Sequence, residues 1–446
     1  MPTAFSATWS GGDGPTLLTY AEYDAVPGNS QAATIGEGPR PGTDGCAAGH
    51  TDPHSALGIS TLGAVLATKT AMQRHGIGGT LRYTGEPAEK VQGSKVVHGL
   101  RGYYDGVDGI VSFHPFYLLP LCNTVRWDTH CGAYSSRIYT FRCDQPEDWG
   151  LADPGSPIPA SHSAARAPGA NAALMTMYTL TKTTQDAMAP AFGGWSLSEA
   201  ILAAGQSTAD NLPARMARIQ YSWRCPDLAT ADQVLRVLDT NAEAAARTAH
   251  CTLETRWVAR NRPGLANHTL ATATYHNLEL VGAPRYGADA VVTARAIQRS
   301  LGLAPTERPF LDETEQLIPP RHAEHRLRRV LPPAQSHWTS DDYVEMTWYS
   351  PTVRLYVARP ALAPRPDGRP HPSWAMNAMG GIAATIDPTI MCAAKTIART
   401  LLDLLRDPAT MANARAEFER RRAHGPVEAL LPSDFTAPHD HGWPTC

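Results

Sequence analysis

The alternation of short apolar segments with helical patterns in the N-terminal part of the chain restricts the fold more than any other feature. Segments 16–20, 80–84 and 109–113 are typical of buried strands. Between the first two, apolar residues recur at helical spacing and Gly76 ends the pattern. A second helical stretch, 95–104, precedes the third segment. This order predicts right-handed crossovers and a mostly parallel sheet, which is an α/β fold.

The middle of the chain, residues 129–256, follows a different pattern. Strand-like and helical segments occur in the order β-α-β-β-α-β, and residues 218–224 alternate strictly between polar and apolar. We therefore predict a ferredoxin-like α+β module inserted into the larger domain. Such a module serves as a lid or a dimerisation surface, because its exposed sheet edge invites pairing with a second copy. The catalytic domain is then formed by residues 1–128 and 257–446.

The C-terminal part returns to α/β structure. Residues 353–358 are typical of a strand, and Pro388 is predicted to lie in the first turn of a long amphipathic helix. The tail from Arg420 to Cys446 is polar and contains prolines, so we expect it to be poorly ordered. At the other end, we expect the first strand to begin at Thr16, with no strand or helix upstream.

Composition excludes several classes of protein. The chain has 446 residues, of which 43% are hydrophobic and 18% charged, and a net charge of -3 without a basic block. Neither nucleic acid nor an acidic membrane is therefore the expected partner. The eight cysteines form no Cys-x-x-Cys pair, which favours reduced thiols over a disulfide framework. With no secretory signal and no long apolar run, we predict a cytoplasmic protein.

Polar residues gather where the predicted strands end. Glu22 and Asp24 follow the first strand, Glu89 the second and His114 the third. In a parallel sheet these positions share the carboxyl edge, where ligands bind. The run His50-Thr-Asp52-Pro-His54 starts the first helix at the same edge, and its imidazoles and carboxylate suit one divalent ion. Capping of the helix is the alternative explanation of that run. The convergence on one edge favours a metal site.

Several motifs together resemble the aminoacylase and carboxypeptidase family of metal-dependent hydrolases, in the subgroup that contains aminobenzoyl-glutamate hydrolase. The resemblance covers nearly the whole chain, and its motifs occur in the family's order. It implies a phosphorylase/hydrolase-like α/β metallopeptidase domain with a ferredoxin-like lid that carries a dimer contact. The motifs are Glu22-Tyr-Asp24-Ala-Val-Pro-Gly, His50-Thr-Asp52-Pro-His54, Pro87-Ala-Glu89, Phe113-His114-Pro and Ser161-His162-Ser followed by Gly169-Ala-Asn171-Ala.

The resemblance also implies roles for single residues. Glu89 is the general base, and His162 on the lid stabilises negative charge in a neighbouring subunit's site. The implied metal ligands are His50, Asp52, His54 and His114, and the implied substrate contacts are Asn211 and Arg224. We therefore expect a small aromatic substrate and a homodimer or higher homo-oligomer formed through the lid domain.

Three departures from the family pattern matter for the metal. Asp52 holds the position of a metal-binding cysteine, which favours manganese over softer ions, with zinc and cobalt as alternatives. Lys90 replaces the second acid of a pair, and a cation there favours one divalent ion per subunit. The late metal ligand stays open between Asp342, Glu345 and His371.

These departures favour, within the resemblance, removal of the ring amino group of 5-nitroanthranilate to give 5-nitrosalicylate and ammonia. The alternative is an amidohydrolase that cleaves aminobenzoyl or other aryl-acyl amino acid amides, since the chemistry of Glu89 serves both reactions. A third hypothesis is a non-enzymatic dimeric scaffold that retains a relic of the metal site.

Overall fold

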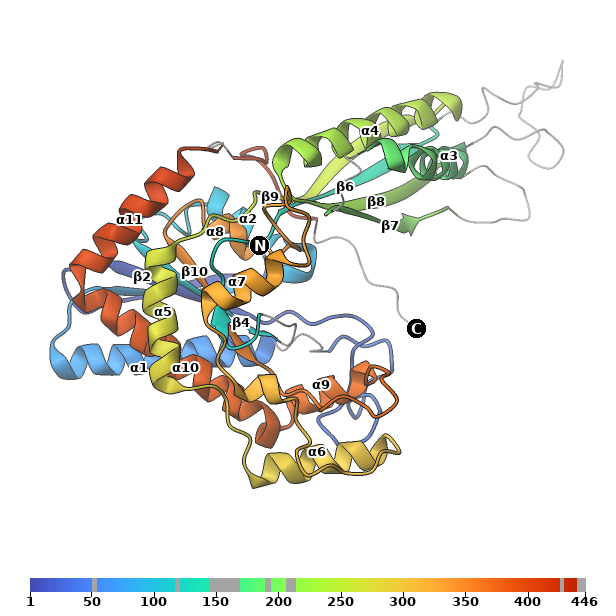
Figure 1. The fold of residues 1–446 in the computed structure, drawn as a ribbon. Coiled ribbons are helices and arrows are strands. Elements are labelled where there is room, and N and C mark those ends of the chain that lie inside the picture. The colour runs from blue at the N-terminus through green and yellow to red at the C-terminus, as the bar shows by residue number, and fades with distance from the viewer. Residues whose placement is uncertain are drawn as a thin grey trace, which may run out of the picture.

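The computed structural model describes residues 1–49, 54–116, 121–144, 169–188, 194–205, 214–425 and 429–438. These residues form two sheets with their covering helices, and the two lie at opposite ends of the molecule (Figure 1). The larger sheet has the strand order β1-β3-β2-β4-β10-β5 and the smaller one β7-β8-β6-β9.

The larger sheet is parallel at its centre, as predicted. Strands β2, β3, β4 and β10 run parallel, while the edge strands β1 and β5 are antiparallel. The central strands are almost entirely buried because both faces are covered, which explains their continuous apolar runs. The strands are β1 (Phe5–Ser10), β2 (Thr16–Glu22), β3 (Thr80–Glu86), β4 (Gly109–Phe116), β5 (Thr124–Val125) and β10 (Thr352–Ala358).

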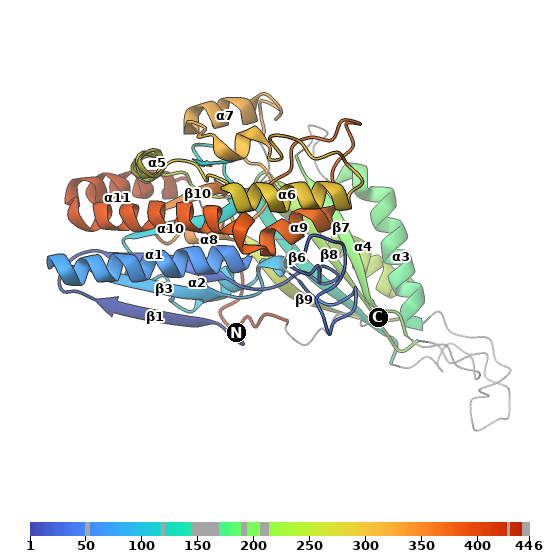
Figure 2. The same ribbon diagram turned by 90° about the horizontal axis from the view of Figure 1, so that it is seen from below.

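Long helices cover this sheet. Helix α1 (His54–His75) runs beside α10 (Ala383–Arg406), and both pack against β4 (Figure 2). Gly76 has φ 62° and ends α1, as predicted. The other helices are α2 (Ser94–Leu100), α5 (His268–Val281), α6 (Ala288–Ser300), α7 (Pro320–Arg328), α8 (Tyr343–Met346), α9 (Ser373–Gly381) and α11 (Pro408–Arg422), with short 3-10 turns η1 (Glu89–Val91) and η4 (Asp312–Glu315).

The smaller sheet confirms the predicted ferredoxin-like module. Its elements occur in the order β6 (Ala133–Arg142), α3 (Gly169–Thr184), β7 (Ser196–Ala203), β8 (Met216–Cys225), α4 (Leu228–Thr248) and β9 (Thr252–Asn261), with a 3-10 turn η3 (Gln185–Ala187) after α3. All its strand pairs are antiparallel, and both helices pack on one face of the sheet (Figure 1). Residues of β8 alternate between buried and partly exposed, because one face packs against α3 and α4.

Three predictions about the elements are wrong. An unpredicted strand, β1, lies upstream of Thr16, and its exposed residues carry no apolar run that would mark it. Pro388 lies inside α10 rather than in its first turn, because that helix already begins at Ala383. In the tail, Leu431 and Phe435 are buried against α2, so the described part of the tail packs on the protein. Among the described helices, none is long and apolar enough to cross a bilayer.

Candidate metal centre and active site

Three buried residues from different elements meet at the carboxyl edge of the larger sheet. Glu22 is the last residue of β2, His54 is the first residue of α1, and His114 lies near the end of β4. One ligand atom from each lies within 4.8 Å of the other two. The two imidazole rings meet edge to face, with centroids 5.6 Å apart. Two imidazoles and a carboxylate are ligands that suit zinc, manganese or cobalt.

Hydrogen bonds that the Nδ1 atoms donate set which nitrogen of each histidine faces the site. Nδ1 of His54 lies 2.7 Å from Oδ1 of Asp24, and Nδ1 of His114 lies 2.6 Å from the carbonyl oxygen of Pro115. Both acceptors require a proton on Nδ1, so Nε2 is the nitrogen that each ring offers to a cation. Metal-binding histidines are oriented by carboxylates and carbonyls in this same way.

The environment of His54 fits a cation. Its Nε2 and Oε2 of Glu22 are 3.3 Å apart and buried, and neither has a hydrogen-bond partner among the described residues. Burial disfavours a charged imidazole, but the carboxylates of Asp24, Glu22 and Glu89 raise the pKa of His54 to about 9. The acids that attract a proton to this position also attract a metal ion, which satisfies the buried lone pairs.

The candidate base, Glu89, lies beside this group. Its Oε2 is 3.7 Å from Nε2 of His54 and 2.8 Å from Nζ of Lys90. Burial raises the pKa of Glu89 above its usual value, against the opposing charge of Lys90. Non-glycine residues with left-handed backbones flank its 3-10 turn: Ala88 has φ 63° and Gln92 has φ 54°. Such sparsely populated conformations cluster at functional sites, where the surrounding structure maintains them.

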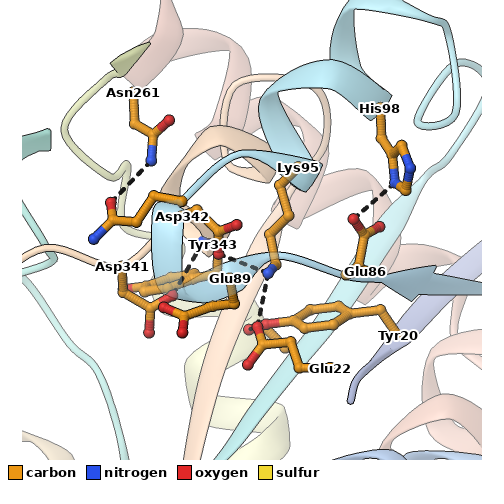
Figure 3. A network of polar contacts seen from close by, with 12 residues as sticks. Tyr20, Glu22, Glu86, Glu89, Lys95, His98, Asn261, Asp341, Asp342 and Tyr343 are labelled. Carbon is orange, nitrogen blue, oxygen red and sulfur yellow. Dashed lines mark hydrogen bonds and ion pairs between the residues drawn. The ribbon is translucent and has the colours of Figure 1, made fainter. Parts of the chain in front are cut away.

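Two buried cations neutralise a second group of acids nearby. Oxygen atoms of Glu22, Asp341 and Asp342 lie within 4.8 Å of one another. Lys95 donates to Oε1 of Glu22 at 2.7 Å and to Oδ1 of Asp342 at 2.6 Å (Figure 3). Arg354 of β10 donates to Asp341.

Lys95 and Arg354 were not identified from the sequence. Neither belongs to a recognisable spacing, and a fully buried lysine is rare. The only signal in the sequence is the placement of Lys95 in a helix whose other residues are mostly apolar or small.

The structure brings together some of the predicted site residues. Glu89, His54 and His114 meet, whereas His50, Asp52, His162 and Asn211 lie outside the described residues. Arg224 is described, and its Nε donates to Oγ of Ser340 at 2.8 Å, next to the acids Asp341 and Asp342.

Of the three candidates for the late ligand, Asp342 is the one that joins a group of acids. Glu345 forms a buried ion pair with Arg262, at 3.0 Å. Nε2 of His371 lies 2.8 Å from the carbonyl oxygen of Ala363. Within the described part of the chain, neither Glu345 nor His371 belongs to a group of potential metal ligands.

Comparison with known proteins supports the family that the motifs indicate, although no family model matches the chain. One of the subunits of the p-aminobenzoyl-glutamate hydrolase of Escherichia coli is 24% identical over 446 residues, which cover 98% of this chain and 86% of that protein. Among solved structures, the aminobenzoyl-glutamate utilization protein of Klebsiella pneumoniae has a TM-score of 0.51 and 14% identity, over 89% of this chain and 74% of that one. This likeness confirms the predicted fold class.

Proposed function

We propose that the chain is a metal-dependent hydrolase of the aminoacylase and carboxypeptidase family, and that it cleaves the amide bond of aryl-acyl amino acids. The observation that carries this proposal is the placement of a partly buried carboxylate, Glu89, beside Nε2 of His54 and Oε2 of Glu22, which have no hydrogen-bond partner among the described residues. The Escherichia coli relative, which its name describes as a hydrolase of aminobenzoyl-glutamate, supports the choice of an amide.

The ligands of the proposed ion are Glu22, His54 and His114. A divalent ion bound to them would act as a Lewis acid and lower the pKa of an attacking water. We propose one ion per subunit, with manganese favoured and zinc or cobalt as alternatives, because hard carboxylate oxygens accompany the imidazoles. The roles predicted for His50 and Asp52 as further ligands stay part of this proposal.

Glu89 moves the proton in the proposed reaction. Its carboxylate accepts a proton from the attacking water and returns it to the nitrogen of the departing amine. Burial favours the first of these transfers, because a carboxylate with a raised pKa accepts a proton from water more readily. Asp24 orients His54 through the Nδ1 hydrogen bond, and it also accepts the backbone N–H of Lys90 at 3.0 Å. One carboxylate therefore positions both a ligand and the turn that bears the base.

Three further roles complete the proposal. We propose that His162 stabilises the negative charge that develops on the carbonyl oxygen, in the site of a neighbouring subunit. Asn211 and Arg224 are proposed to contact the substrate. The role of His162 requires a homodimer or larger homo-oligomer, which we propose is formed through the ferredoxin-like module. Mixing an inactive His162→Ala variant with an inactive Glu89→Gln variant tests the sharing of sites, because mixed dimers would regain activity in one site.

The experiment that tests the proposed reaction compares two substrates. Metal-stripped protein is assayed with aminobenzoyl-glutamate and with 5-nitroanthranilate, before and after addition of manganese. We expect manganese-dependent cleavage of the amide and no ammonia from the nitroaromatic amine. The Escherichia coli relative favours this alternative over ring deamination, the reaction that the sequence predicts first. Release of ammonia from 5-nitroanthranilate alone would reverse the assignment.

Variants of Glu89 test the base. Loss of a general base typically costs about 100- to 10,000-fold in rate, and we expect Glu89→Gln to fall in this range. Glu243→Gln is the matched control, because Glu243 is an exposed residue of α4 in the other domain. Equal activity of Glu89→Gln and the wild type would refute the mechanism, whereas an unchanged control shows that the assay responds to the site alone.

A further inference from the structure

We propose that Lys95 supplies a second positive charge to the site, and that its ammonium group fills a position that would otherwise hold a second metal ion. This inference rests on the proposed function, because it concerns the number of metal ions that the same site accepts. It identifies Lys95 of α2 as the reason that the site binds a single ion, in place of Lys90, the residue that departs from the family motif.

The ammonium group of Lys95 is enclosed by acids. Its Nζ lies 2.7 Å from Oε1 of Glu22 and 2.6 Å from Oδ1 of Asp342, and all three side chains have no exposed surface (Figure 3). The same Nζ lies 4.9 Å from the centroid of the Tyr20 ring, a cation–π distance. Its surroundings are thus two carboxylates and one aromatic face, which stabilise a positive charge.

The surrounding carboxylates have the arrangement of a cation site. Oxygen atoms of Glu22, Asp341 and Asp342 lie close enough to bind one ion together. Arg354 donates to Asp341, and it also donates to the hydroxyl groups of Tyr20 and Ser112 at 2.6 and 2.8 Å. Arg354 therefore offsets one of the three negative charges, and Lys95 is the cation in contact with the other two. Removing its charge would leave buried carboxylates that require another cation.

Glu22 connects this position with the proposed metal ligands. Its Oε1 accepts from Lys95, while its Oε2 lies 3.3 Å from Nε2 of His54. A carboxylate that bridges two metal ions has one oxygen on each, and Glu22 has the same arrangement with an ammonium group on one side. Lys95 is thus a positioning residue, since it holds the carboxylate with Oε2 directed at the histidine.

Lys90 is placed less well for this role. Its side chain is partly exposed, and its Nζ contacts Glu89, which belongs to a different group of acids from Asp341 and Asp342. A lysine at the rim of the site modulates the base, whereas the enclosed ammonium of Lys95 occupies space among the ligands.

The test counts metal ions in the full-length protein. Wild type, Lys95→Met and the double variant Lys95→Met/Asp342→Asn are loaded with manganese, desalted and analysed by elemental mass spectrometry. Methionine keeps the length of the lysine stem without its charge, and the Asp342 change removes a ligand of the vacated position. We expect one ion per chain in the wild type, two in Lys95→Met and one in the double variant. Thermal melts with and without manganese provide a second readout, with Lys95→Met gaining more from the ion than the wild type does.

Each outcome separates this inference from the proposed function. A wild type that binds no manganese would overturn the proposed metal site itself. One ion in both the wild type and Lys95→Met would overturn the role of Lys95 alone, as would two ions in the wild type. If Lys95→Met folds only with manganese, the inference is supported. If it stays unfolded with manganese while the double variant folds, the position does not accept a metal ion and the inference fails.

Discussion

Asp24 is the residue whose substitution tests the proposed metal site most directly. It is not one of the three proposed ligands, because both of its oxygens are already engaged, one with Nδ1 of His54 at 2.7 Å and one with the N–H of Lys90 at 3.0 Å. Replacing a carboxylate that orients a metal-binding histidine typically costs about 10- to 100-fold in metal affinity, or about 1.4 to 2.7 kcal/mol.

The structure assigns the two ends of that range to two variants. Asp24→Asn keeps one oxygen that accepts from Nδ1, but it loses the charge and the second oxygen, which accepts from the N–H of Lys90, so we expect a loss of about tenfold. Asp24→Ala removes the acceptor and frees the ring to rotate, so we expect about 100-fold. Burial alone would raise the pKa of Asp24, but the hydrogen bond and charge of His54 hold it below its usual value, and the carboxylate is therefore ionised at neutral pH.

Competition for manganese between the protein and a fluorescent chelator measures both losses. The control is Asp289→Asn, which makes the same change at an exposed aspartate in the first turn of α6. Unchanged affinity in both Asp24 variants would refute the orienting role. A loss in Asp24→Asn as large as in Asp24→Ala would instead identify what both variants lack, the charge and the acceptor for the N–H of Lys90, as the main contribution.

Two further predictions concern stability. Burial raises the pKa of Glu417, but hydrogen bonds from the N–H groups of His268 and Thr269 outweigh burial, and the pKa is lowered. The ionised carboxylate therefore stabilises the fold above the unfolded-state pKa near 4.5, and this stabilisation is lost as the pH falls. Glu417→Gln should thus lower the free energy of unfolding in urea by about 1–3 kcal/mol at pH 7, and by less at acidic pH; a constant difference would contradict the assignment. Arg262→Met should lower the free energy of unfolding by about 3–5 kcal/mol, because it leaves the carboxylate of Glu345 buried without its ion-pair partner. The double variant Arg262→Met/Glu345→Leu should recover most of this loss. Equal losses in the single and double variants would exclude the unpaired carboxylate as the cause.

The hydrophobic pattern was sufficient to predict most of the fold. Strands covered on both faces have continuous apolar runs, and strands covered on one face alternate between apolar and polar residues. The exceptions follow from exposure and from local sequence. Strand β1 lies at an edge, where an exposed strand needs no apolar run. Helix α9 ends at Gly381 and α10 begins shortly after it, at Ala383, so Pro388 lies inside α10.

The candidate site was predictable mainly where its residues lie beside strand ends in a local motif, and Asp342 was predicted only as one of three candidates for the late ligand. Glu89 follows β3, His114 lies near the end of β4, and His54 begins α1 at the same edge, and parallel topology brings such positions together. Asp341, Asp342 and Arg354 come from far along the chain. They reach the site because β10 pairs with β4, a neighbour relation that no local pattern specifies.

Ser340 shows how the second domain contributes to this site. Its Oγ accepts from Arg224 of β8 and from Nε2 of Gln92, each at 2.8 Å. Gln92, which ends the turn of Glu89, also accepts from Asn261 of β9 at 3.1 Å. The ferredoxin-like module therefore holds both the turn that bears the base and the segment that bears Asp341.

This arrangement separates two roles for Arg224. If it acts through Ser340, then Arg224→Ala and Ser340→Ala should lower kcat to a similar extent, and the double variant should lose little more, because both changes remove one hydrogen bond. If it binds a carboxylate of the substrate, Arg224→Ala should raise KM while Ser340→Ala leaves it unchanged. Since the guanidinium is already held on Ser340, the residue before Asp341, we expect both effects in Arg224→Ala and only the first in Ser340→Ala. Steady-state kinetics of the three variants decide this, and an unchanged kcat in Ser340→Ala would exclude the coupling through Ser340.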